Sequence, residues 1–172
     1  MTDKIGHWKY EGEPFDPDDY FGFIYIISVD HDGGCTRYIG KKQFHSYKKK
    51  KRDKESNWRT YTSSSKHLNS LISEVAKDKV SLEIVQLFET RGGLVAGECK
   101  VQWYLDVLTE KDGEGVPLYL NRQIGAVKFI PKEAITDETK ARLDDLYRSG
   151  RVLIQGRGEG EETTTNECEE VS

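Results

Sequence analysis

The stretch "GFIYIISVDHDGGCTRYIGKK", from Gly22 to Lys42, contains two short apolar runs on either side of a turn rich in Asp and Gly. Alternation in the first run places Phe23, Tyr25 and Ile27 on one face of a strand, and Ile24 and Ile26 on the other face. The Asp and Gly residues suit the positive φ angles of a hairpin turn. The stretch therefore predicts a hairpin that carries Tyr25 on its first strand and Tyr38 on its second.

Further elements follow the hairpin in the order helix, strand, helix. A serine-led helix has apolar residues at three- and four-residue steps, and Thr90 is a plausible cap for a second helix. This order predicts an α/β sandwich built on a small, mainly antiparallel three-stranded sheet flanked by helices. The expected later elements are the helix containing Leu68, Leu71, Ile72 and Val75, a strand from Leu82 to Phe88, a helix from Thr90 to about Leu108, an extended piece over 118–124 and a small helix from Asp137 to Arg148.

The 172 residues, with 35% hydrophobic content, predict one folded core with irregular ends. We expect an acidic lead-in over 1–20, a folded domain over 21–130, a helical extension over 131–152 and an acidic, disordered tail over 153–172. There is no apolar run of membrane length and no signal-peptide pattern. The three cysteines lack metal-type spacing. We expect a soluble cytoplasmic protein without a membrane partner; its oligomeric state stays open, with a monomer as the simplest case.

The net charge of −4 conceals a strongly basic segment. The stretch from Arg157 to Ser172 has one Arg and six Glu, whereas the stretch from Arg37 to Lys66 has eleven Lys and Arg against two acids. A block of one sign indicates a polyanionic partner such as DNA. The alternative is that the run "KKKKRDK" is a solvated loop.

A carboxylate interrupts the apolar stripe of the second predicted helix. The stripe consists of Leu94, Glu98, Val101, Leu105 and Leu108. An ionised carboxylate is costly to bury alone, so Glu98 needs a cation, a metal ion or hydrogen-bond donors. Alternatively, it lies at the edge of the stripe in water, or pairs with Lys66 or Lys100.

These features together resemble the GIY-YIG nuclease family. The motifs are "FIY" from Phe23 to Tyr25 and "YIG" from Tyr38 to Gly40, followed in the family's order by Glu98 and by Asn121 in "YLN". The stretches "YIGKKQF" and "NWRTYTSSSKHL" are most similar to bacteriophage endonucleases of this family. The resemblance covers about Gly22 to Arg122. If the protein is phage-encoded, the expected location is the host cytoplasm.

The resemblance implies a DNA endonuclease that hydrolyses phosphodiester bonds by in-line attack of water with one divalent metal ion. It assigns Glu98 as the ligand of Mg²⁺ or Mn²⁺, and Tyr25 as the group that orients or deprotonates the water. A tyrosine pKa near 10 requires nearby cations to lower it for that role. Tyr38 would add its hydroxyl to the same cleft, and Asn121 would brace the site by hydrogen bonding.

The resemblance also implies a catalytic arginine on the segment after Tyr38. Its usual spacing from Tyr38 falls on Lys48, and Arg52 lies on the same face if the segment is helical. Arg52 is therefore the predicted catalytic cation, with Lys42, Lys48 and Arg59 as alternatives. The residues expected to bind the substrate are Lys41, Lys42, Lys48, Arg59, Ser64 and Ser65. The serines have an alternative role as a helix cap.

Other readings of these residues remain open. Strand tyrosines commonly serve packing alone. His45 and His67 either assist proton transfer or have no catalytic role. Phe23 occupies the position of the family's first glycine, so the alternative function is a catalytically inactive nucleic-acid-binding module that retains the fold. The segment "ITDETKARLDDLYRSGR" has a faint similarity to a DNA-binding helix attached to homing nucleases, but its balanced charges favour a packing helix.

Overall fold

The computed structural model describes residues 4–148. The strands are β1 (Gly22–His31), β2 (Gly34–Gln43), β3 (His45–Lys48), β4 (Lys51–Glu55) and β5 (Val80–Phe88). The helices are α1 (Lys66–Glu74), α2 (Arg91–Tyr104) and α3 (Asp137–Leu143), with shorter helical turns at η2 (Pro17–Asp19), η3 (Lys77–Lys79) and η4 (Asp144–Arg148). The predicted tail over 153–172 lies outside the described residues.

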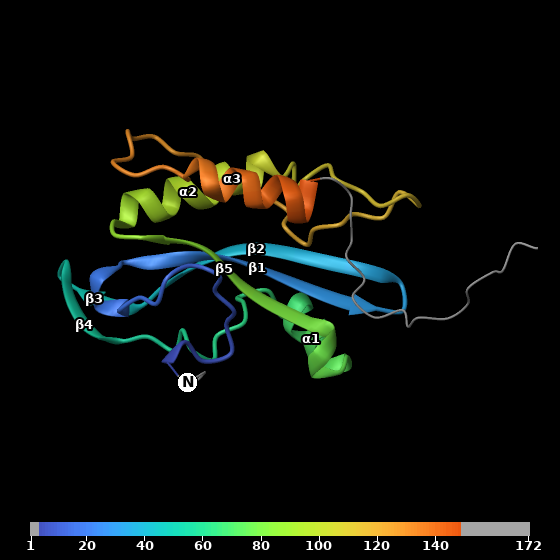
Figure 1. Cartoon of the computed structure of the whole chain (residues 1–172), viewed down its shortest axis with the longest axis horizontal. Helices are drawn as coiled ribbons and strands as arrows, with labels where there is room; N and C mark the ends of the chain where they lie inside the picture. The colour runs from blue at the N-terminus through green and yellow to red at the C-terminus, as the bar shows by residue number, and fades with distance from the viewer. Residues whose placement is uncertain (1–3, 149–172) are drawn as a thin grey trace, which may run out of the picture.

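The main sheet has three antiparallel strands in the order β2-β1-β5, so β1 is central and β2 lies at an edge. Helices α2 and α3 cover one face, whereas α1 and the N-terminal segment lie on the other (Figure 1). This arrangement confirms the predicted α/β sandwich. The hairpin is also confirmed, with Tyr25 opposite Gly40 and Ile27 opposite Tyr38.

Strand alternation divides the core into two clusters. Ile24 and Ile26 pack beneath α2 and α3, whereas Phe23, Tyr25 and Ile27 pack toward α1 and Trp8. Helix α2 approaches the sheet closely at Gly97, where a Cβ would collide with the ring of Phe88. The two faces of β1 therefore contact different layers, as the alternation predicts.

The basic segment forms a second small sheet. The helix on which the choice of Arg52 depended is therefore wrong. Strands β3 and β4 pair as an antiparallel hairpin, and Lys49 and Lys50 turn between them with φ of 48° and 67°. Lys48 pairs across the hairpin with Asp53 at 3.2 Å. A helix would bring lysines together at three-residue spacing, whereas the turn lets them project into water.

Helix α2 also ends earlier than expected. Its last residue is Tyr104, and Asp106 takes a left-handed φ of 50° just beyond it. Leu108, predicted in the buried stripe, is 45% exposed because the chain has left the helix. The other apolar members of the stripe, Leu94, Val101 and Leu105, are buried.

The segments outside the expected domain contribute to the core. Trp8 is buried in the lead-in, and the backbone of Lys9 bonds to Leu82 and Ile84 at the edge of β5. Leu143 of α3 is fully buried, in agreement with a packing helix. None of the helices within residues 4–148 has the length and apolar character needed to cross a membrane.

Candidate active site

A pocket of about 450 Å³ opens at the edge of β2, between the C-terminal part of this strand, α1, α2 and the segment after Tyr119. Five residues expected at the site line it together, namely Tyr38, Lys41, Ser65, Glu98 and Asn121. The remaining lining residues are His67, Gln102, Leu120, Arg122, Gln123 and Gly125. The pocket thus collects residues that are far apart in the sequence.

The pocket begins where a short parallel pairing along β2 ends. The N–H of Arg37 donates to Leu118, and its carbonyl accepts from Leu120, each at 2.8 Å. At Ile39, two residues further along β2, the Asn121 side chain takes the place of the backbone as the hydrogen-bonding partner. Its amide oxygen accepts from the Ile39 N–H at 2.9 Å, and its nitrogen donates to the Ile39 carbonyl at 2.8 Å. Asn121 therefore satisfies the β2 edge at the pocket rim; its role in a reaction stays a prediction.

Glu98 enters the pocket from α2 and forms an ion pair with Lys41 of β2. Its side chain is 15% exposed, so it lies at the edge of the stripe and has a cationic partner. The partner is Lys41, one of the predicted substrate-binding residues, and neither Lys66 nor Lys100. The ion pair explains how a carboxylate is tolerated beside the apolar residues of α2.

The donor set at Glu98 is compatible with a hydrated Mg²⁺ ion. Mg²⁺ usually takes one or two carboxylates from a protein and keeps several waters. Within residues 4–148, no cluster of three or more His, Cys, Asp or Glu side chains suits a fully protein-coordinated metal. A single carboxylate on an open pocket therefore fits a partly hydrated ion, because the bond from Lys41 goes to one carboxylate oxygen, Oε2.

Tyr25 lies beneath the pocket and does not line it. The side chain is buried, with its ring centroid 5.1 Å from that of Trp8 and 6.2 Å from that of Tyr61. Burial raises the pKa of Tyr25, and Tyr61 and Tyr38 raise it further. The expectation that nearby cations lower this pKa is therefore wrong, because burial dominates.

Gly40 of the second motif accommodates Tyr25. The two residues face each other across β1 and β2, and a Cβ on Gly40 would collide with the Tyr25 hydroxyl and ring. The tyrosine of one motif thus lies over the glycine of the other. This contact explains why the residue opposite Tyr25 in the hairpin is a glycine.

The chain matches a known protein family. A family model described as "Putative endonuclease segE, GIY-YIG domain" matches residues 8–124. The chain belongs to this GIY-YIG family. The matched region begins at Trp8, which contributes to the core around Tyr25. No curated protein and no solved structure matches the chain.

In this GIY-YIG domain, the predicted catalytic cation lies outside the pocket lining. Arg52 donates to the carboxylate and backbone carbonyl of Asp18, at 3.2 and 2.7 Å. Lys48 and Arg59 pair with Asp53 and Glu55 in the same region. The three cations are therefore held in ion pairs around the β3–β4 hairpin, with partners in the hairpin or in the lead-in.

Other predicted substrate-binding residues of the GIY-YIG domain lie beside the pocket. Lys42 donates to Asn57 at 2.8 Å and lies 3.9 Å from the ring centroid of Tyr61. Ser65 lines the pocket and caps α1 by accepting from the Leu68 N–H, whereas Ser64 is exposed outside the lining. The capping role is thus realised; contact of either serine with phosphate stays a prediction.

Three polar pocket residues were not identified from the sequence of the GIY-YIG domain: Gln102, Arg122 and Gln123. Gln102 follows Glu98 by one helical turn, so its spacing alone would have placed it on the same face of α2. Arg122 and Gln123 directly follow Asn121. Arg122 adds a guanidinium to a pocket that lacks Arg52. His67, whose role the sequence left open, also lines the pocket.

Proposed function

We propose that the protein is a metal-dependent DNA endonuclease that hydrolyses phosphodiester bonds in the pocket at the β2 edge. The observation that carries this proposal is the meeting of Glu98 with Lys41, Tyr38 and Asn121 at one opening. Family membership supports nuclease activity and DNA as the substrate. Metal dependence and the roles of individual residues are our inference.

The chemistry requires a negative metal ligand and positive groups around the phosphate. Glu98 would hold Mg²⁺ or Mn²⁺, which would polarise the phosphate when bound. Lys41, after release from Glu98, would contact a phosphate oxygen, and Arg122 would offer a second, bidentate contact. These two cations would take the part that the sequence assigned to Arg52.

Tyr38 would orient the attacking water in this proposal, which its position in the pocket lining supports. Tyr25 would position Tyr38 through their ring contact, with centroids 6.4 Å apart. His67, in the same pocket, is a candidate for accepting the proton of the water, since imidazole side chains commonly act as general bases. Asn121 would keep the edge of β2 in place while DNA binds.

Glu98→Gln tests the proposal, with Glu89→Gln as a control because Glu89 is an exposed carboxylate just before α2. With Mg²⁺, we expect the parent and the control to cut supercoiled DNA. Glu98→Gln should lose at least about a hundredfold in rate, in line with removal of a group that stabilises the transition state. Circular dichroism should show both variants folded. Undiminished cleavage by Glu98→Gln would remove the metal-ligand assignment.

The second candidate is a nucleic-acid-binding module without catalysis. Two observations favour it: Arg52 is engaged by Asp18 outside the pocket, and Phe23 replaces the first glycine of the family motif. It predicts salt-sensitive DNA binding without cleavage in either Mg²⁺ or Mn²⁺. Assays on supercoiled, linear and branched DNA distinguish the two candidates.

A further inference from the structure

A second cavity, of about 600 Å³, adjoins the candidate active site. It lies between the outer face of α2, the segment 124–135 and Lys140 of α3. Gly125 lines both this groove and the pocket at β2, and Cys99 on its wall is the neighbour of Glu98. The groove and the pocket that contains Glu98 therefore adjoin at Gly125.

The walls of the groove are mostly apolar and include an exposed aromatic ring. Trp103 is 60% exposed, whereas the other two tryptophans, Trp8 and Trp58, are buried at 3% and 0%. Ile124, Val127 and Pro131 form the opposite wall. Beyond the groove, Phe129 and Ile130 are 47% and 95% exposed. Large apolar side chains gathered in this way on a surface indicate a binding site.

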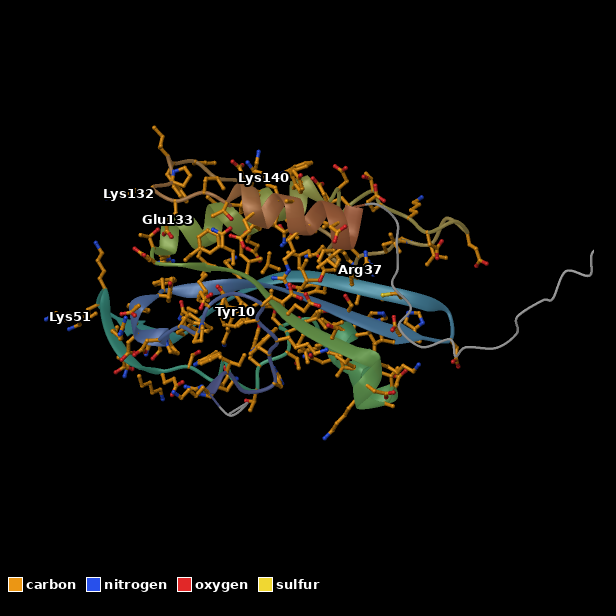
Figure 2. All side chains as sticks on the ribbon, in the orientation of Figure 1. Tyr10, Arg37, Lys51, Lys132, Glu133 and Lys140 are labelled. Carbon is orange, nitrogen blue, oxygen red and sulfur yellow. The ribbon has the colours of Figure 1, made fainter. Side chains whose placement is uncertain are left out.

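The charges around the groove favour an anion. The segment 121–132 contains Arg122, Lys128 and Lys132 and no acidic residue, and Lys100 is exposed on α2. The acid on the groove wall, Glu133, is occupied by the start of α2, where it accepts from the backbone N–H groups of Glu89 and Thr90. Figure 2 shows Lys132, Glu133 and Lys140 along the layer of α2 and α3.

We propose that this groove binds an unpaired nucleotide of DNA next to the phosphate held at Glu98, with its base against Trp103. Bases in a duplex are stacked and hydrogen-bonded, so an apolar slot with one exposed ring accepts a base only after it leaves the stack. The surrounding cations would contact the adjoining phosphates. The inference rests on the proposed nuclease function, and it makes branched, gapped or single-stranded DNA the favoured substrate.

Binding without cleavage tests this inference separately from the nuclease proposal. The full-length chain is titrated with a single-stranded dT oligonucleotide and a duplex of equal length, in EDTA at low salt. Quenching of the tryptophan emission by DNA reports mainly on Trp103, because Trp8 and Trp58 are buried and shielded from the bases. We expect stronger quenching by the single strand than by the duplex. Equal quenching, or none, overturns the inference.

Trp103→Ala should weaken single-strand binding by about 5- to 150-fold, the range expected for loss of one base stack. Trp103→Phe should bind within a few-fold of the parent. Leu108→Ala is the matched control, because Leu108 is 45% exposed and does not line the groove. Unchanged binding by Trp103→Ala overturns the inference. The inference also fails if the parent is a dimer and Trp103→Ala is a monomer, because the groove would then hold a second copy of the chain.

Cleavage by the parent and single-strand binding by Trp103→Ala together separate the two proposals. If the parent cuts no DNA yet Trp103→Ala loses single-strand binding, the nuclease proposal fails and the groove remains a nucleotide site. If the parent cuts DNA and Trp103→Ala binds normally, only the groove assignment fails.

Discussion

Replacement of Asn121 by Ala removes both hydrogen bonds that the side chain makes to Ile39, at 2.9 and 2.8 Å. Each such bond contributes a net 0.5–1.5 kcal/mol, so we expect the free energy of unfolding to fall by about 2 kcal/mol. Water cannot replace the two lost hydrogen bonds, because Ile39 is fully buried and its backbone groups have poor access to solvent. For a domain of this size, the melting temperature should drop by about 4–8 °C.

Urea denaturation followed by tryptophan emission measures this change. The midpoint should move while the slope stays constant, because the surface exposed on unfolding is unchanged. Gln123→Ala is the control, since Gln123 is an exposed neighbour in the same pocket; its effect should stay within about 0.5 kcal/mol. If Asn121→Ala is as stable as this control, the backbone pairing at Arg37 alone holds the edge of β2, and our account of Asn121 is refuted.

Asn121→Asp tests which group of the Asn121 side chain faces the N–H and which faces the carbonyl of Ile39. The introduced carboxylate can still accept from the Ile39 N–H, but it faces the Ile39 carbonyl that the amide nitrogen served. This repulsion raises the pKa of the carboxyl in the folded state, so the folded chain binds more protons than the unfolded one. Stability should therefore rise as the pH falls from 7 toward 4. A variant whose stability is flat in this range would contradict the geometry.

Three further predictions concern the hairpin and the cations. Gly40→Ala should destabilise the fold by about 1–3 kcal/mol, because Tyr25 cannot move aside within its packed cluster; an unchanged melting curve would contradict this. Arg52→Ala should leave cleavage within about threefold of the parent, whereas Lys41→Ala should lower it at least about tenfold; the reverse order in a plasmid-nicking assay would restore the assignment to Arg52. Burial raises the pKa of Cys35 to about 11, so its alkylation, followed by peptide mass spectrometry, should still accelerate between pH 8 and 10; a rate that levels off near pH 9 would show an ordinary thiol.

The hairpin and the two main helices were predictable because their signals are local. Alternation in β1 fixed which residues face each layer, and Ser65 and Thr90 cap α1 and α2 as expected. The position of Glu98 followed from the period of one helix. Its partner did not, because Lys41 is separated from it by 57 residues and meets it only when α2 packs on the sheet. Lys66 and Lys100 were closer in sequence but not in space.

The helix expected for the basic segment was wrong because the segment has too few apolar residues to show a helical or a strand period. A spacing rule taken from the family assumed a helix, and the chain formed the β3–β4 hairpin instead. Its cations then paired with Asp18, Asp53 and Glu55, which lie nearby in this hairpin or in the lead-in. The pair of Arg52 with Asp18 depends on a tertiary contact between the lead-in and the hairpin, so the sequence could not reveal it.

The two motif tyrosines show where strand alternation stops being informative. Tyr25 and Tyr38 belong to the same face, yet Tyr25 is buried and Tyr38 reaches the pocket. The difference arises because β1 is the central strand, covered by Trp8 and Tyr61 from distant parts of the chain, while β2 is an edge strand. At this edge, Tyr38 meets Glu98, which α2 brings from the opposite face. A site that draws on both faces of a sheet needs an edge, and the order β2-β1-β5 supplies one beside the motif.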